Sequence, residues 1–321
     1  MLLQGIEAGK VIDLIKARVA TPGVESHRKL ALVVEGGAMR GVYTGGALLG
    51  LHLFDATRVF DSAYGTSSGA VNAAHFLSGQ GHLKAATYYK ALIDGKFFSP
   101  LRLHRVVDID FFVDGVLRGL IPLELECVLA AKIPLRIALL NCTDGCGQVI
   151  TLPQTLPDAW NVIRASVSMP LVYNRTVTIG DKQYADGGLP IPFPLDAAIE
   201  DGCTDLLILR SCDPNVSVGR DRLIFRALYA LFFARGNKEL VKIYDQWPET
   251  ITRLGAIAAG RLPVRQGVRI ATISPVDPQV TISTMNRSLL RQACHDMARE
   301  TLALFGGDAR ELDALIADDI V

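Results

Sequence analysis

Ser67 lies in a pattern that suits a catalytic nucleophile. The segment Gly65-Thr66-Ser67-Ser68-Gly69 follows an apolar stretch and precedes a helical pattern, which is the strand–turn–helix order that a nucleophile elbow requires. Glycines two positions before and after the serine relieve crowding in such a turn. The hydroxyl would then lie at a helix N-terminus, whose free N–H groups favour a developing anion. An ordinary turn with Ser67 or Ser68 as the helix N-cap explains this motif alone equally well.

A second glycine-rich segment, Gly36–Gly41 (GGAMRG), directly follows a buried apolar run and precedes a helical pattern. Backbone N–H groups in such a loop can hold a phosphate or an oxyanion. The Gly-Lys-Ser/Thr ending of a Walker A loop is absent. The dinucleotide-binding pattern G-x-G-x-x-G is matched only in degenerate form, and no clear strand carries Asp55, the candidate for its acidic residue. The simplest alternative is a turn that needs positive φ angles.

Asp186 is the candidate acidic partner of the serine. It precedes two glycines and lies between two predicted strands, 176–179 and 182–185, and the proline-rich segment 189–194. An aspartate before two glycines is often only a turn. Here the prolines stiffen the loop that follows, so a carboxylate held at this point can be aimed at a partner elsewhere in the chain.

The histidines do not complete a catalytic triad. A serine hydrolase usually carries a histidine base between the serine and an acid. Of the six histidines only His295 follows Asp186, and it lies in a helical stretch instead of a loop after a strand. His75 lies about two helical turns beyond Ser67, so its side chain should point away from the serine hydroxyl. We therefore expect structural or surface histidines, and a Ser67–Asp186 dyad fits these residues better than a triad.

The cysteines do not form the pattern of a metal site. Cys142 and Cys146 are close in sequence, but zinc needs four ligands and no second Cys/His pair has zinc-like spacing. A chain of this length does not need disulfides to fold. We therefore expect buried structural thiols, no metal and no cofactor. The six cysteines are Cys127, Cys142, Cys146, Cys203, Cys212 and Cys294.

Apolar segments of strand length alternate with helical patterns, which predicts an α/β layered fold with a mostly parallel central sheet flanked by helices and a helical C-terminal part. The expected strands are 30–34, 62–65, 135–140, 176–179, 182–185, 205–210 and 267–273. The expected helices are 42–54, 70–77, 84–93, 122–131, 157–166, 195–201, 222–245 and 285–305.

No linker rich in Pro, Gly or Ser divides the chain convincingly. We expect residues 1–28 to form an N-terminal helix and linker, and residues 29–321 to form a single α/β domain. Within that domain the motifs occupy a core at 30–210, and 215–321 is a helix-rich C-terminal part.

The composition excludes two classes of protein. Basic and acidic side chains balance at 33 each, which gives no electrostatic footprint for nucleic acid. A hydrophobic fraction of 50% and a mean hydropathy of +0.28 exclude an intrinsically disordered chain. The oligomeric state is not predicted by these features.

The apolar content does not form a spanning segment. The longest clean apolar run, 227–234, is far shorter than the ~20 residues of a transmembrane helix. Glu7, Lys10 and Asp13 interrupt the N-terminal apolar pattern, so it lacks the core of a signal peptide. We therefore expect a cytoplasmic protein, with peripheral contact at a membrane surface left open.

One segment has the composition of a membrane-surface helix. Residues 221–235 place Arg222, Arg226 and Arg235 around an apolar stripe, as in amphipathic helices that lie on anionic membranes. A core helix with a solvated edge is the somewhat favoured alternative.

The motifs together resemble the patatin-like phospholipase family. In that family a glycine-rich oxyanion loop with a basic residue follows the first strand, a G-x-S-x-G elbow comes next, and Asp-Gly-Gly or Asp-Gly-Ala lies far downstream. The corresponding segments here are Gly36–Gly41, Gly65–Gly69 and Asp186–Gly188, and 163–170 resembles the family's A-S-x-x-x-P helix end. The resemblance covers about residues 30–210. One departure is Ala38, which stands where the loop usually has a third glycine; its methyl group can alter the oxyanion hole or the substrate fit.

The resemblance implies a serine lipid acyl hydrolase, an esterase of the phospholipase A or lysophospholipase type, acting on a lipid or acyl-ester substrate. Ser67 would be the nucleophile, Asp186 the base, and Gly65 and Gly69 the elbow glycines. Arg40 would support the loop, which is the favoured role, or contact a substrate phosphate. The oxyanion hole would be formed by N–H groups of Gly36, Gly37, Ala38 and Met39.

Two other functions and the use of the aromatic pairs stay open. The loop at 36–41 could serve a nucleotide- or phosphate-binding protein, or the chain could be a catalytically silent patatin-like binding protein. The pairs Phe97-Phe98 and Phe111-Phe112 are expected mainly in the core, and a lipid-facing groove is the alternative.

Overall fold

The computed structural model describes residues 1–23, 27–81, 87–93, 95–99, 101–102, 106–173, 175–213 and 222–318, with only the backbone of residues 222 and 223. Part of the helix expected at 84–93, and the Arg222 side chain, therefore lie outside the described residues. Among the described helices, none combines the length and the apolar character that crossing a bilayer requires.

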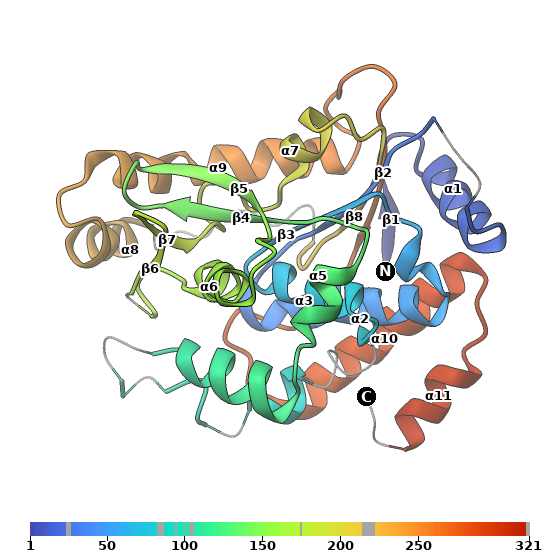
Figure 1. Cartoon of the computed structure of the whole chain (residues 1–321), viewed down its shortest axis with the longest axis horizontal. Helices are drawn as coiled ribbons and strands as arrows, with labels where there is room; N and C mark the ends of the chain where they lie inside the picture. Colours follow the sequence, from blue (N-terminus) through green and yellow to red (C-terminus); the bar gives the residue numbers. More distant parts are fainter. Residues whose placement is uncertain are drawn as a thin grey trace.

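The described strands form one nine-stranded sheet at the centre of the molecule, in the order β1-β9-β8-β2-β3-β4-β7-β6, with β5 also paired to β4 (Figure 1). The run from β9 through β8, β2 and β3 to β4 is parallel, and the other pairings are antiparallel. The prediction of a mostly parallel α/β sheet is thus confirmed. The strands are β1 (Leu2–Gln4), β2 (Leu30–Val34), β3 (Ser62–Thr66), β4 (Leu135–Asn141), β5 (Cys146–Thr151), β6 (Val177–Ile179), β7 (Lys182–Asp186), β8 (Asp205–Leu209) and β9 (Arg269–Ser274).

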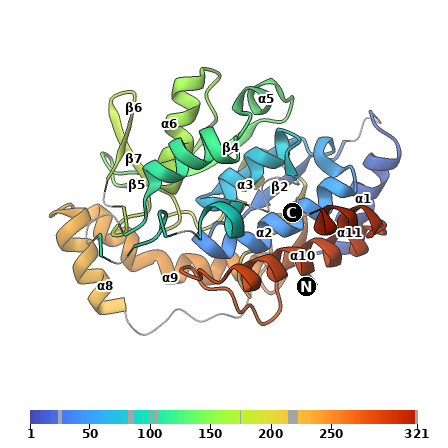
Figure 2. The ribbon, with the colours of Figure 1, turned by 90° about the horizontal axis from the view of Figure 1, so that it is seen from below.

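Helices cover both faces of the sheet (Figures 1 and 2). One face carries α1 (Ala8–Ala20), α2 (Gly41–Leu53), α3 (Ser68–Leu77), α5 (Leu125–Ala130), α6 (Leu156–Val167), α10 (Arg287–Phe305) and α11 (Arg310–Ala317). The other face carries α7 (Leu195–Glu200) and α9 (Lys238–Ala258). Among the described residues, π-helical segments span Thr87–Ala91, Phe111–Leu120 and Tyr229–Ala234, and the last of these continues α8 (Arg222–Leu228).

Strand β2 shows why the sequences of the central strands are continuously apolar. Every residue of β2 is buried. Leu30, Leu32 and Val34 belong to the core on the α2/α3 side, whereas Ala31 and Val33 belong to the core under α7 and α9. Successive side chains of a strand point to opposite faces, and because helices cover both faces, neither set can be polar.

The structure corrects the expected elements in several places. Residues 2–4, expected in the N-terminal helix, form β1 and pair antiparallel with β9. This strand is too short to show the alternation of apolar and polar residues that would identify it in the sequence. β5, α11 and the helical segment Phe111–Leu120 were not expected either. The helix expected at 222–245 is interrupted because Arg235 and Gly236 both adopt positive φ angles (46° and 89°), and α9 restarts with the Asn237 side chain accepting from the Glu239 and Leu240 amides.

Candidate active site

Ser67 occupies the turn between β3 and α3 in a strained conformation. Its φ of 56° and ψ of −134° place a non-glycine residue outside the common regions. A Cβ atom at Gly65 would lie 2.5 Å from Ala70 Cα, and one at Gly69 would lie 2.4 Å from the Val34 carbonyl oxygen. The glycines are thus required by close backbone packing. The Ser67 hydroxyl makes no capping hydrogen bond to α3, so the turn has the geometry of an elbow instead of an ordinary N-cap.

The Ser67 hydroxyl donates to Asp186 Oδ2 at 2.5 Å. Strand β4 brings the two together, because β5 pairs along one edge of β4 while β3 and β7 share the other edge. Thr66 at the end of β3 pairs with Ala138, and Asp186 at the end of β7 pairs with the next residue, Leu139. Two strands that approach from opposite directions therefore end at adjacent positions.

The two glycines after Asp186 have separate roles. A Cβ atom at Gly187 would lie 2.5 Å from the backbone of Ala138, so only glycine lets the chain turn away this close to β4. The Gly188 amide donates to Asp186 Oδ1 at 2.8 Å. The carboxylate is therefore held through one oxygen by the backbone, while its other oxygen faces Ser67.

Asp186 is 4% exposed, and this burial raises the pKa of Asp186 to about 7, against the smaller lowering effects of its hydrogen bonds with Ser67 and Gly188. Water stabilises a carboxylate more than a low-dielectric interior does, so burial favours the protonated form. A carboxylate with a pKa near 7 is a much stronger base than a free aspartate, whose pKa is ~3.9.

The glycine-rich loop lies directly against the elbow. A Cβ atom at Gly36 would lie 2.6 Å from Ser67 Cβ, so the absence of a side chain permits this contact. Gly37 and Ala38 have φ angles of 149° and 51°, and the positive angle at Ala38 is one that L-residues other than glycine rarely adopt. Within the described ranges, the amides of Gly36, Gly37 and Ala38 donate to no protein acceptor. They are available to an anion beside the serine.

The next two residues of the loop differ from these. The Met39 amide donates to the carbonyl of Ile282 at 3.4 Å, so it is already engaged within the protein. Arg40 lines the cavity at Ser67. Its Nε atom is buried without a hydrogen-bond partner, and no carboxylate pairs with its guanidinium among the residues that the structure describes. If Arg40 supports the loop, as the sequence favoured, it does so without a carboxylate partner among these residues.

A buried ion pair behind the loop was missed from the sequence. Glu35 and Arg210 are 4% and 2% exposed, and Arg210 donates to both carboxylate oxygens at 3.1 Å. The Ser211 amide donates to the same carboxylate at 2.8 Å. This network ties the residue before Gly36 to the end of β8. The available signal was a charged residue directly after each of two buried apolar strands.

Two adjacent cavities open at Ser67. The first, about 200 Å³, is lined by Ser67, Asp186, the glycine-rich loop and Trp247 of α9. The second, about 110 Å³, is almost entirely apolar. It contacts Ser67 at one end and is lined by Phe97, Phe98 and Phe112. The aromatic pairs thus contribute to a groove next to the serine as well as to the core.

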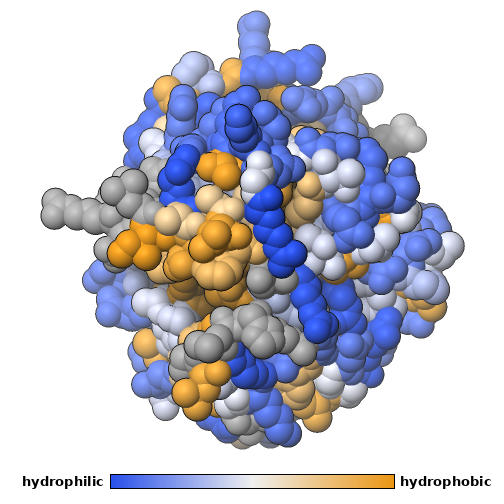
Figure 3. Space-filling model, turned by 90° about the vertical axis from the view of Figure 1, so that its left-hand side faces the viewer, coloured by the Kyte–Doolittle hydropathy of each residue, from blue (hydrophilic) through white to orange (hydrophobic). Residues whose placement is uncertain are grey.

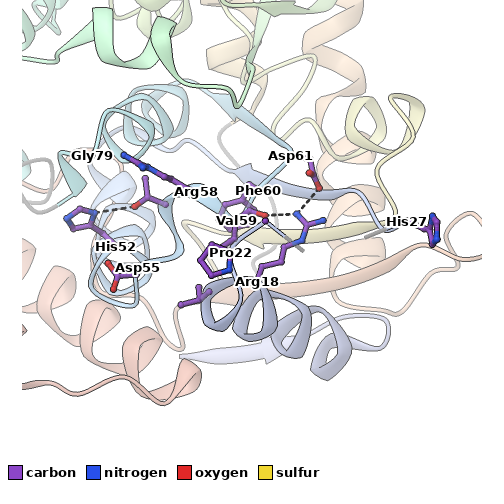
Figure 4. Close-up of a pocket in the computed structure, with 13 residues that line it drawn as sticks. Arg18, Pro22, His27, His52, Asp55, Arg58, Val59, Phe60, Asp61 and Gly79 are labelled. Carbon is purple, nitrogen blue, oxygen red and sulfur yellow. Dashed lines mark hydrogen bonds and ion pairs between the residues drawn. The ribbon is translucent and has the colours of Figure 1, made fainter. Parts of the chain in front are cut away.

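A larger cavity, about 1200 Å³, lies away from the serine (Figure 4). Asp61, in the wall of this cavity, directly precedes β3, whereas Ser67 directly follows β3. The cavity therefore lies at the N-terminal end of β3, and the serine lies at its C-terminal end. Arg18 donates to Asp61 at 2.8 Å and to the Val59 carbonyl at 2.6 Å, and His52 shares a hydrogen bond with Thr57. Arg18 also donates to the Arg28 carbonyl at 2.8 Å, and Asp61 accepts from the Leu30 amide at 2.6 Å, so these polar groups join α1 to the start of β2 and β3.

Neither cavity at Ser67 has a histidine among its described lining residues. His75 and His295 are buried on α3 and α10. The six cysteines are free thiols, and within the described part of the chain no group of three or more His, Cys, Asp or Glu side chains is arranged to hold a metal ion. The arrangement at the serine is therefore a hydroxyl, a buried carboxyl group and three backbone amides.

Comparison with known proteins places this site in a family. The model of the patatin-like phospholipases matches residues 32–199, a range that includes the glycine-rich loop, the elbow and Asp186. The chain is also 30% identical over 190 residues to the "Uncharacterized protein YjjU" of Escherichia coli (strain K12), covering 57% of this chain and 52% of that protein; it thus spans about half the length of this relative. Because the family model covers more than half of the sequence, the chain belongs to the patatin-like phospholipases, a family of lipid acyl hydrolases.

Proposed function

We propose that the protein hydrolyses carboxylic esters of phospholipids or lysophospholipids, with Ser67 as the nucleophile and Asp186 as the base. The observation that carries this proposal is the 2.5 Å hydrogen bond from the Ser67 hydroxyl to the buried Asp186 carboxylate, beside amides that donate to no acceptor among the described residues. Near neutral pH a large fraction of Asp186 is ionised, given its pKa of about 7, and can accept the serine proton.

In the first half of the reaction the Ser67 oxygen attacks the ester carbonyl carbon while its proton passes to Asp186. The negative charge on the former carbonyl oxygen is stabilised by the amides of Gly36, Gly37 and Ala38. Each such donor typically contributes about 3–4 kcal/mol to transition-state stability. The ester C–O bond then breaks, the alcohol leaves with the proton from Asp186, and the acyl group stays on Ser67.

In the second half a water molecule attacks the acyl carbon and gives a proton to Asp186. The acyl–oxygen bond to Ser67 breaks, Ser67 takes back the proton from Asp186, and the fatty acid leaves. A single carboxylate thus acts as base and then as acid in each half, which requires a pKa near the working pH. The raised pKa of Asp186 meets that requirement.

The two cavities support a substrate with one apolar and one anionic part. The apolar cavity beside Ser67 would take the acyl chain. Arg40 lines the other cavity, so we assign its guanidinium to the phosphate of the head group. This replaces the loop-supporting role that the sequence favoured, because the described residues provide no carboxylate partner for it.

Labelling with a fluorophosphonate tests the nucleophile. Wild-type protein should be labelled, Ser67→Ala should not, and Ser78→Ala, which removes a hydroxyl at the other end of α3, should be labelled at the wild-type rate. Asp186→Asn should slow both labelling and p-nitrophenyl ester hydrolysis by about 10²–10⁴-fold, the range for loss of a general base. Labelling of Ser67→Ala at the wild-type rate would exclude the proposed nucleophile. Absence of labelling in the wild type, together with thermal stabilisation by NAD(P) or ATP, would favour the phosphate-binding alternative.

A further inference from the structure

The surface of α8 and its π-helical continuation carries large apolar side chains that face solvent. Their exposed fractions are 68% for Ile224, 53% for Phe225, 38% for Leu228, 68% for Leu231 and 49% for Phe232. We call these five residues the α8 patch. The sequence favoured a core helix here, and that expectation is wrong for this side of the helix. Only Tyr229 and Ala234, on the inner side, are buried among the described residues of the segment.

The α8 patch lies at the outer end of the molecule. α8 forms the left-hand edge in Figure 1, and Figure 3 views that side, where hydrophobic side chains gather with hydrophilic ones above and to their right. Exposed apolar clusters of this kind on a soluble surface mark an interaction site. Single exposed apolar residues need no such explanation, but five within nine positions of one helix do.

Charges of both signs lie around the α8 patch, and two of the cations have no carboxylate partner among the described residues. Residues 221–249 carry five basic and four acidic side chains. Arg226 is neutralised by Asp245, to which it donates twice, at 2.6 and 2.8 Å. Arg235 and Lys238 are exposed, and no carboxylate pairs with either among the described residues. Apolar side chains with cations at their edge match an anionic lipid surface, in which the side chains enter the acyl region and the cations meet the head groups.

The patch is continuous with the walls of the candidate active site. Tyr229, on the inner side of the patch helix, packs on Tyr244 of α9 with ring centroids 5.1 Å apart. Trp247, one turn further along α9, lines the cavity at Ser67. Tyr229 also belongs to the apolar cluster that contains Ala185, the neighbour of Asp186 in β7. The patch helix therefore packs against elements that also line the cavity at Ser67.

We infer that the α8 patch docks the protein onto anionic lipid bilayers. Ile224, Phe225, Leu228, Leu231 and Phe232 enter the outer acyl region, and Arg235 and Lys238 contact the anionic head groups. The role that we assign to this docking, which is to bring membrane phospholipid to the serine, rests on the proposed function. The binding itself requires no catalysis.

Vesicle flotation with the Ser67→Ala protein tests binding without hydrolysis. The protein should float with vesicles of equimolar phosphatidylcholine and phosphatidylglycerol, more weakly with phosphatidylcholine alone, and less at high salt. Leu231→Gln combined with Phe225→Gln should lower the partition coefficient on the anionic vesicles by about tenfold or more, since binding scales with buried apolar area. Leu262→Gln, which replaces another exposed leucine (41%) beyond the end of α9, should bind like the parent protein.

Three results would overturn the inference. The first is absence of flotation by the parent protein, and the second is equal flotation by the Leu231/Phe225 double variant. The third is that the parent protein sediments as a dimer in the absence of vesicles while the double variant sediments as a monomer. That result would assign the patch to a second copy of the chain. Esterase activity on a monomeric, water-soluble ester tests the proposed function separately from membrane docking. The wild type and the double variant should hydrolyse this ester at equal rates, whatever the flotation results are. If the wild type shows no esterase activity but floats with the anionic vesicles, the proposed function is rejected and the docking surface is supported.

Discussion

Ser67 and Asp186 are 119 residues apart in the chain, yet a 2.5 Å hydrogen bond joins them because β4 is the common neighbour of their strands. Thr66 pairs with Ala138 and Asp186 with Leu139, so the parallel strand β3 and the antiparallel strand β7 end at adjacent positions on one edge. The tight turns enforced by Gly65 and Gly187 then direct the two side chains toward each other. The sheet, more than either loop, determines the distance between hydroxyl and carboxylate.

We expect esterase activity to rise with pH through the pKa of Asp186. Only the ionised carboxylate accepts the serine proton, and burial places that pKa at about 7. The profile of kcat/KM on an uncharged p-nitrophenyl ester should therefore increase about tenfold per pH unit below this value and level off above it. A profile that is flat from pH 5 to 8 would mean that the base has the pKa of an ordinary aspartate.

The same carboxylate should make the folded state less stable as pH rises. The pKa of Asp186 is about 7 in the folded protein and ~3.9 in the unfolded chain, so between these values the folded state binds more protons. The free energy of unfolding must then fall with increasing pH. The difference in that free energy between Asp186→Asn and wild type should grow from pH 4 to 7 in favour of the variant and stay constant above pH 7. Urea denaturation across this range measures it, and a constant difference throughout would contradict the raised pKa.

Ala38→Gly should stabilise the protein slightly. Ala38 has a φ of 51°, which costs an L-residue about 1–2 kcal/mol and glycine almost nothing, whereas glycine loses about 0.4–1 kcal/mol through the greater freedom of the unfolded chain. The net expected gain in unfolding free energy is about 0.5–1 kcal/mol, with esterase activity retained because the amide is unchanged. Ala314→Gly, at an exposed position inside α11, should instead lose about 1 kcal/mol. Equal losses in the two variants would show that Ala38 is not strained.

The Glu35–Arg210 pair should contribute to both stability and oxyanion binding. Glu35→Gln leaves the buried Arg210 charge without a counterion, which typically costs about 3–5 kcal/mol. The matched change Asp196→Asn breaks an ion pair with Arg253 that is 47% exposed on each side and should cost less than about 1 kcal/mol.

The double variant Glu35→Gln/Arg210→Gln separates the two contributions of the pair. It should regain part of the stability, because neither member of the pair is charged any longer. It should not regain kcat, because Ser211 no longer anchors the loop through a carboxylate. Full recovery of kcat in the double variant would mean that the pair does not position the loop.

Local sequence signals determined the central strands, the elbow and the glycine-rich loop. The apolar run 30–34 and the glycines around Ser67 depend on residues a few positions apart, and their physical causes, burial on both faces and crowding in a tight turn, act at that range. The order of the motifs also indicated the family. For this reason the sheet class and the family assignment were predicted correctly.

Tertiary structure decided what depends on neighbours distant in the chain. The pairing of β1 with β9, the burial of Glu35 against Arg210, and the pKa of Asp186 all arise from contacts that no local pattern encodes. The apolar stripe at 224–232 is the sharpest case. Its composition favours a core helix somewhat over a membrane-surface helix, and it does not decide between them, because helical periodicity defines an apolar face without specifying what covers it. Only the folded chain places Tyr229 against the protein and leaves Leu231 exposed.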